Sequence, residues 1–122
     1  MHYDLEERVS IFAENILDFA QKHEKNGVIK VIIFQLARSA TSIGANYMEA
    51  NCAESKKDFI HKIAICNKEI KESSYWLRLS AKILKNEAET INVFRKESLE
   101  LNKIFSKILI SSKINESLKK LN

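Results

Sequence analysis

Residues 35–50 read QLARSATSIGANYMEA, a run rich in Ala, Ser and Gly that follows the bulky apolar segment VIKVIIF at residues 28–34. The chain contains no proline and two glycines, so almost nothing in its composition interrupts a helix. Ile, Leu, Lys, Glu and Ala are abundant in the remainder, and most of these residues favour helices. The sequence therefore predicts an all-α fold in which this run belongs to a long helix.

Apolar residues at i, i+3 and i+4 spacing, together with capping residues, divide the chain into helices. The predicted helices span residues 4–25, 28–53, 56–84 and 91–118. Connectors of only a few residues force long helices to fold back on one another. At 122 residues one core suffices, so residues 1–122 are predicted to form a single domain, an up-down-up-down four-helix bundle.

Capping residues mark both ends of the first predicted helix. Asp4 and Glu7 have the spacing of a capping box at its start. Asn26-Gly27 follows its end and supplies a residue for a left-handed cap. These signals place the connection to the second helix at residues 26–27.

The third and fourth predicted helices also begin at capping residues. Ser55 stands at the cap of the third helix, and acidic Asp58 follows where it suits the helix dipole. Residues 85–90, KNEAET, form a short polar connector, and Thr90 caps the fourth helix. Beyond Ser111 the apolar spacing weakens, so the final residues are expected to fray.

Signatures of catalysis and of metal binding are missing from the sequence. There is no glycine-rich phosphate loop, HExxH or G-x-S-x-G motif. Asp58 and His61 have a spacing used in di-iron bundles, but those sites need a second copy and two further glutamates. Cys52 and Cys66 form no CxxC motif and are expected to be small buried hydrophobes. The sequence predicts a non-enzymatic protein with no catalytic residues, metal site or cofactor.

The amino terminus, MHYDLEERVS, is acidic and lacks the basic start and apolar stretch of a signal peptide. No uninterrupted apolar run reaches the length of about 18 residues that spans a bilayer. We therefore expect a cytoplasmic protein with no membrane partner.

Charge is distributed unevenly along the chain. Residues 1–54 hold five Lys or Arg and eight Asp or Glu, whereas residues 55–122 hold fifteen and eight. The two halves thus differ in sign within a total of +4. This asymmetry indicates a polyanionic partner, acidic and basic helices packed side by side, or head-to-tail self-association.

The second and third helices each carry more apolar surface than a monomeric bundle needs. A second face of the second helix comprises Phe34, Ala37, Thr41, Gly44, Ala45, Met48 and Cys52, and a second face of the third comprises Ile65, Trp76, Leu79 and Ile83. Small side chains allow another helix to approach closely, and Met adapts to irregular surfaces. We expect these faces to meet a neighbouring subunit, with Arg38, Glu49 and Glu69 in charge pairs at its margin. A monomer that buries both faces itself is the alternative.

The remaining side of the third helix is basic. It comprises Lys56, Lys57, Lys68, Lys71, Arg78, Lys82 and Lys85, with Lys96, Lys103 and Lys107 on the outward side of the fourth helix. Such side chains bind phosphates without sequence preference and with strong salt dependence. The alternative is a lysine-rich surface that serves solubility. Tyr75 and Trp76 could stack on bases, but Trp76 falls on an apolar face and is better explained as an anchor.

Residues 35–50 and the downstream DFIHKIAICNKEIKESSYWLRL resemble the small four-helix bundle proteins encoded in intervening sequences of bacterial 23S ribosomal RNA genes. The pattern S-I-x-x-N-x-x-E-A followed by E-x-x-Y-W-L carries the resemblance, which covers nearly the whole chain. Many members have proline where this chain has Gly44. The resemblance implies a bundle that assembles into a ring, commonly a pentamer.

The chain is also similar to the accessory variability protein of diversity-generating retroelements, a basic pentameric barrel associated with nucleic acid and a reverse transcriptase. For most of this family no biochemical function is established, so two hypotheses remain. In the first, the chain is a homo-oligomeric RNA- or DNA-binding accessory protein that also recruits a protein partner. In the second, it is a structural or protein-interaction ring without a nucleic-acid role.

Overall fold

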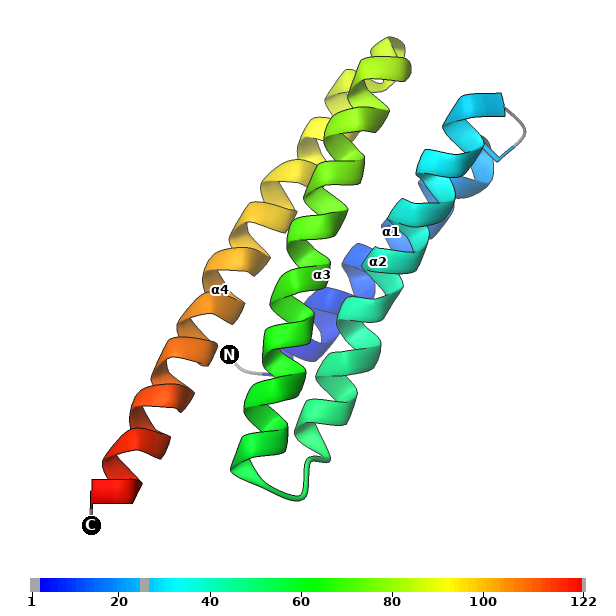
Figure 1. Ribbon diagram of the computed structural model, residues 1–122. Helices are drawn as coiled ribbons and strands as arrows, with labels where there is room; N and C mark the ends of the chain where they lie inside the picture. Colours follow the sequence, from blue (N-terminus) through cyan, green and yellow to red (C-terminus); the bar gives the residue numbers. More distant parts are fainter. Residues whose placement is uncertain (1–2, 25–26, 122) are drawn as a thin grey trace.

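The computed structural model describes residues 3–24 and 27–121 of the chain, and this part contains helices and no strand. The helices are α1 (Tyr3–Lys22), α2 (Gly27–Asn51), α3 (Lys56–Ile83), the short 3-10 helix η1 (Lys85–Glu87) and α4 (Ala88–Leu121). Consecutive long helices run in alternating directions (Figure 1). The predicted all-α four-helix architecture is therefore confirmed.

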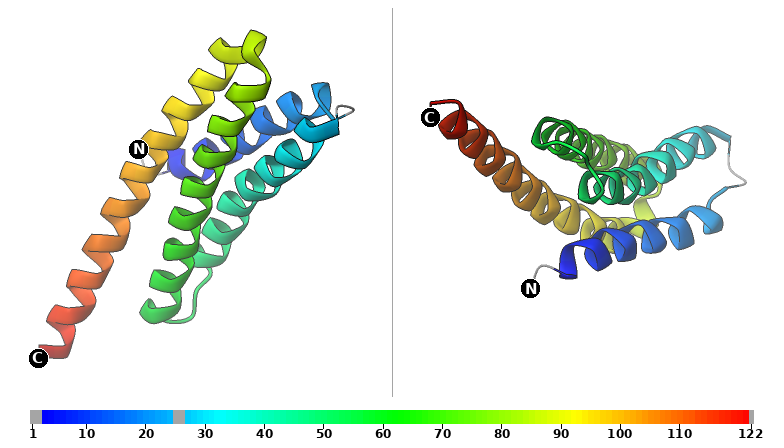
Figure 2. Two further views of the ribbon diagram at one scale, coloured as in Figure 1. Left: turned by 45° about the horizontal axis from the view of Figure 1, so that its top comes forward. Right: turned by 90° about the horizontal axis from the view of Figure 1, so that it is seen from below.

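The four helices pack unequally. α2 packs most extensively on α3, α3 also packs on α4, and α1 lies mainly against α2. Figure 2 shows the C-terminal half of α4 diverging from α1, which is the shortest of the four long helices. The bundle is therefore closed by α1 along only part of its length.

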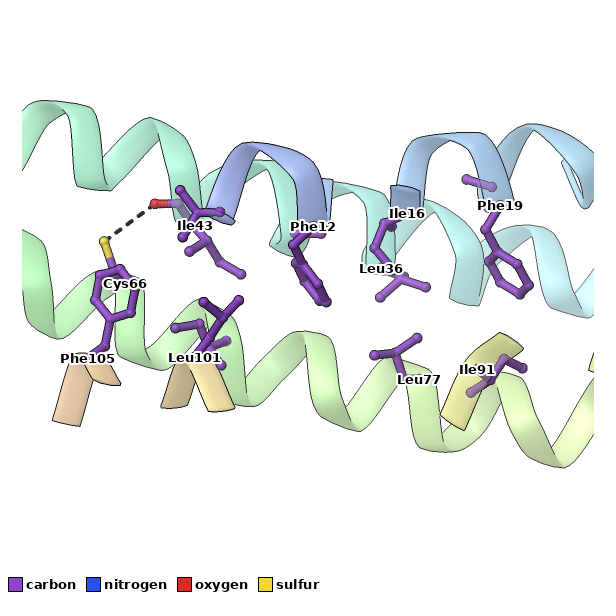
Figure 3. Close-up of a cluster of buried hydrophobic side chains, with 14 of the residues drawn as sticks. Phe12, Ile16, Phe19, Leu36, Ile43, Cys66, Leu77, Ile91, Leu101 and Phe105 are labelled. Atoms are coloured by element: carbon purple, nitrogen blue, oxygen red, sulfur yellow. Dashed lines mark hydrogen bonds between the residues drawn. The ribbon is translucent and has the colours of Figure 1, made fainter. Parts of the chain in front are cut away.

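All four long helices contribute to the core (Figure 3). The buried side chains labelled there are Phe12, Ile16 and Phe19 of α1, Leu36 and Ile43 of α2, Cys66 and Leu77 of α3, and Ile91, Leu101 and Phe105 of α4. The thiol of Cys66 donates to the carbonyl oxygen of Ile43 at 3.4 Å. Full burial of one Leu or Ile side chain stabilises a fold by about 1.5–3 kcal/mol. Burial of this cluster therefore holds the four long helices together.

Two polar contacts attach α1 to the C-terminal part of the chain. Arg8 Nε and Nη2 donate to the two carboxylate oxygens of Glu97 in α4, at 2.7 and 2.9 Å. His23 Nε2 lies 2.9 Å from Glu87 Oε2 in η1. These pairs set the position of α1 where apolar contact with α4 is sparse.

The cap predicted for the third helix is confirmed. The backbone N–H of Asp58 donates to Ser55 Oγ at 3.1 Å, and Ser55 has extended backbone angles at the N-cap of α3. An N-cap of this kind satisfies one of the helix's unpaired N–H groups. It also defines the turn that joins α2 to α3.

Several predicted helix ends were wrong. α1 begins at Tyr3, so Asp4 lies inside the helix, and Gly27 opens α2 without a positive φ. Asn26, the other half of the predicted cap, lies outside the described residues. These signals misled because Asp is also favourable within a helix's first turn, and Gly is also tolerated at a helix start.

The fourth helix is longer than predicted at both ends. α4 begins at Ala88 rather than at Ile91, and Thr90, the predicted cap, lies inside it; residues 85–90 contain no Gly or Pro and can continue as η1 and a first turn. It continues to Leu121 instead of fraying beyond Ser111. The lysines in its last turn suit the negative end of the helix dipole.

α2 is also the one helix in the described ranges that is long and apolar enough to cross a membrane. A mean hydropathy of 1.3 over its best window satisfies that test, and 33% of the window is buried in the bundle. Ile29, Leu36 and Ile43 are among its buried residues. The core helix of a bundle can have the same length and composition, so these two properties do not identify α2 as a membrane span.

Candidate nucleic-acid interface

The outward side of α3 carries a row of cations, here called the basic face. It comprises Lys57, Lys68, Lys71, Arg78 and Lys82, with Lys85 of η1 at its end, and all six are exposed. Successive helical residues turn by about 100°, which places these positions on one side of the helix. The predicted basic surface is therefore exposed, and its phosphate binding remains a prediction.

The two glutamates of α3 lie away from the basic face. Glu69 is buried toward α2, where Arg38 Nη1 approaches its Oε1 at 3.5 Å. Glu72 accepts a short hydrogen bond from Arg38 Nη2. Burial lowers the pKa of Arg38. The hydrogen bond with Glu72 and the charges of both glutamates raise it by more than burial lowers it, so the net shift of the pKa is upward. This internal neutralisation leaves the outward charge of α3 positive.

An aromatic side chain stands within the basic face. Tyr75 is 52% exposed, and its ring contacts that of Trp76 edge-on, with centroids 5.2 Å apart. Trp76 is half-buried against the core, and its Nε1 donates to Glu72 Oε1 at 3.3 Å. Trp76 was predicted to anchor a face toward a neighbouring subunit; here it packs on the core of its own chain, and its role at an interface stays a prediction.

Lysines of α4 extend the positive surface around the bundle. Lys103 and Lys107 are exposed, and α4 packs on α3, so they lie on the helix next to the basic face. Lys103 Nζ is 3.4 Å from Glu100 Oε2, which offsets part of its charge. Lys107 therefore adds more to the positive potential of this side than Lys103 does.

The predicted second face of α2 is divided between the chain's own α1 and the solvent. A Cβ atom placed on Gly44 would lie 3.7 Å from Val9 Cγ2 of α1, and Ala37 packs against the core. Small residues on this margin thus admit α1 of the same chain. The outer stripe of α2, by contrast, is exposed: it comprises Val31, Phe34, Thr41, Ala45 and Met48, and it continues to Cys52 directly after the helix end.

A groove of about 340 Å³ runs between α1 and α2 beside the outer stripe. Leu17 and Ala20 line it from α1, and Ile33 and Ala37 line it from α2. Phe34, also in its lining, is 66% exposed. Exposed apolar surface of this kind is suited to pack against a further helix, because packing removes it from water.

The three charged residues predicted for a subunit margin have partners inside the chain. Arg38 bonds Glu72 and lies beside Glu69, as described above, and Lys62 Nζ donates to Glu49 Oε1 at 2.6 Å. The hydroxyl of Thr41 donates to its own helix, at Ala37 O. Any interface with another copy therefore depends on apolar contact more than on these charges.

One exposed apolar stripe was missed in the sequence. Ile110, Ile114 and Leu118 are exposed at i, i+4, i+8 spacing along the last turns of α4. The spacing alone identifies a helix face. The expectation of fraying beyond Ser111 overlooked this spacing, which continues to Leu118.

The two cysteines occupy different environments, and both thiols are free. Burial raises the pKa of Cys66 to about 12, so this thiol is an inert core residue, as predicted. Cys52 follows the last residue of α2 and is exposed, so its predicted burial was wrong. No group of three His, Cys, Asp or Glu side chains that could hold a metal occurs in residues 3–24 and 27–121.

Comparisons with known proteins give a consistent relationship. A family model described as 23S rRNA-intervening sequence protein matches residues 4–107. The chain is similar to a crystal structure of a protein of unknown function from the S23 ribosomal protein family of Bacteroides thetaiotaomicron, with 34% identity and a TM-score of 0.77. The match covers 85% of this chain and 96% of that one. None of the curated proteins matches the chain.

Proposed function

The chain belongs to the 23S rRNA-intervening sequence protein family, and on that premise we propose that it is a non-enzymatic, homo-oligomeric nucleic-acid-binding protein. The basic face of α3 is the observation that carries the proposal. Its six cations are exposed, whereas the glutamates of α3 are turned toward Arg38. Such a surface attracts a polyanion and releases counterions when it binds one. The family name refers to ribosomal RNA, so RNA is the first ligand to test.

Self-association is the second part of the proposal. The outer stripe of α2 exposes Phe34 and Met48, 66% and 59% of whose surfaces are accessible. Contact between copies would cover these side chains, which are costly to leave in water. Several basic faces in one ring would add their individually weak phosphate contacts through avidity. A ring, with five copies as its expected number, is the assembly that we propose.

A charge-reversal experiment tests the nucleic-acid part. We expect Lys71→Glu, Arg78→Glu and Lys82→Glu together to abolish the binding of a labelled RNA at about 50 mM salt, where phosphate contacts are strong. Fluorescence anisotropy measures the affinity. Reversal of Lys22, Lys30 and Lys113, which are exposed on other helices, changes the net charge equally and serves as control. Equal loss in both variants would show that net charge, and not the basic face, binds RNA.

Salt dependence provides a quantitative check. Each phosphate contact contributes about 0.7 to the slope of log K against log salt for single strands and about 0.9 for duplexes. Loss of three contacts should therefore lower the slope by about 2–3. An unchanged slope in the charge-reversed variant would contradict contact between phosphates and Lys71, Arg78 and Lys82.

Assembly is tested separately by light scattering. We expect Phe34→Glu with Met48→Glu to reduce the assembly to a monomer, because two charges then interrupt the apolar stripe. Val93→Glu with Leu99→Glu places the same change on exposed positions of α4 and should leave the assembly intact. A wild-type monomer at micromolar concentration would remove the oligomer from the proposal.

A second function, a structural or protein-interaction ring, has its own support in the exposed outer stripe of α2. This apolar stripe can pack against another protein, whereas it offers no positive charge to bind a polyanion. An intact oligomer that binds neither RNA nor DNA at low salt would favour this second function.

A further inference from the structure

Tyr75 interrupts the basic face with a flat aromatic surface. It follows Lys71 by one helical turn and precedes Arg78 by another, so cations flank its exposed ring along the helix. The other four residues of the basic face are lysines: Lys57, Lys68 and Lys82 in α3, and Lys85 in η1. The exposed ring therefore has a cation one turn before it and another one turn after it.

The ring of Tyr75 is also held in place. Its neighbour Trp76 meets it edge-on at 61° and is itself fixed by the hydrogen bond to Glu72. Glu72 is bound in turn by Arg38 of α2. A side chain supported in this way loses little conformational freedom on binding, which favours affinity.

We propose that the basic face binds single-stranded nucleic acid, with an unpaired base stacked on Tyr75. This inference rests on the proposed function and adds the class of strand. Cations along a groove or face hold the backbone of a single strand, while aromatic side chains stack on its bases. A duplex hides the faces of its bases inside the helix and offers Tyr75 only phosphate and sugar.

Substitution of the ring tests the proposal. Tyr75→Ala should weaken binding of an unstructured oligouridine by about 5- to 150-fold, the range expected for loss of one stacked base. It should change the binding of an RNA duplex of equal length less than about twofold, since phosphate contacts remain. Tyr75→Phe keeps the aromatic surface and should bind like the wild type, whereas Tyr75→Leu keeps only apolar volume and should behave like Tyr75→Ala.

An abasic oligonucleotide offers a test in the ligand. It keeps the phosphates and removes the bases, so the wild type should prefer oligothymidine over it by the same factor that Tyr75→Ala loses. The preference should vanish in Tyr75→Ala, which makes a double-mutant cycle between base and ring. Oligouridine and oligodeoxyuridine of equal length differ only in the 2′-hydroxyl and distinguish RNA from DNA as the source of the base.

Trp76 supplies an independent readout, since it is the one tryptophan of the chain and touches Tyr75. Oligouridine should change its fluorescence in the wild type and Tyr75→Phe but not in Tyr75→Ala. Equal weakening of single strand and duplex in Tyr75→Ala, or no weakening of either, overturns the stacking role and leaves the proposed function standing. Failure of the wild type to bind any nucleic acid overturns both.

Discussion

α2 and α3 are neighbouring helices of similar length, yet their outward sides have opposite chemistry. α2 presents the apolar outer stripe, including Phe34 and Met48, whereas α3 presents Lys71, Arg78 and Lys82. The charge of the α3 side restricts its role, because a row of exposed cations can face only the solvent or a polyanion. The apolar side was ambiguous, because a helix of the same chain or of another copy can cover it.

A comparison of the two cysteines has the largest expected effect. Cys52 lies on the outer stripe of α2, whereas Cys66 lies in the core with a pKa raised from 9.0 to about 12. That shift alone lowers the thiolate fraction of Cys66 about 1000-fold at pH 8, and thiolate is the reactive form. Iodoacetamide should therefore modify Cys52 first, as mass spectrometry of the labelled peptides will show.

Slow labelling of Cys52 in the wild type that becomes fast in Phe34→Glu would instead show a second copy covering the stripe.

The raised pKa of Cys66 also predicts how alkaline pH changes stability. Cys66 titrates near 9.0 when unfolded and near 12 when folded, so the free energy of unfolding falls as pH rises between these values. Cys66→Ala should remove this pH-dependent contribution, and well below pH 9 the ionisation of Cys66 should no longer make stability depend on pH.

The division of α2 into inner and outer positions predicts unequal costs for the same substitution. Gly44→Leu should destabilise the fold by about 1–3 kcal/mol, because the added carbons enter the space of Val9 in α1. Ala45→Leu, one residue later and exposed, should change stability by less than about 0.5 kcal/mol. Urea unfolding measures both, and equal losses would mean that α1 does not cover Gly44.

The turn between α2 and α3 fixes how their outward sides are placed relative to each other. Ser55→Ala removes the acceptor for the Asp58 N–H and should cost about 1 kcal/mol. Ser55→Asp restores an acceptor and should recover most of that loss. Thermal unfolding compares the variants, and an unchanged midpoint for Ser55→Ala would contradict the cap.

The smallest expected effect is a gain in stability. Gly44→Ala adds a methyl group at ordinary contact distance from Val9, and Ala favours a helix interior by about 0.8–1 kcal/mol over Gly. We expect a stabilisation of about 0.5–1 kcal/mol in urea unfolding. A destabilised Gly44→Ala would show closer contact with α1 than the structure has.

Periodicity and composition were sufficient for the number of long helices and for the Ser55 cap. Helix ends were less predictable, because residues such as Asp4 and Thr90 are acceptable both at a cap and within a first turn. The exposure of the basic residues followed from charge alone. Two features could not be predicted from the sequence: the proximity of Gly44 to Val9 and the pairing of Arg38 with Glu72. Both depend on how helices pack around one another.

The short α1 has a dynamic consequence. It is held largely by one side of α2, by the Arg8–Glu97 pair and by the contact of His23 with Glu87. Partial opening that detaches α1 breaks fewer contacts than separation of α2 from α3, so amide protons of α1 should exchange with deuterium before those of the central hairpin. The chain then behaves as a stable helical hairpin with a detachable cover, and the first hydrophobic surface released on warming is the inner side of α1.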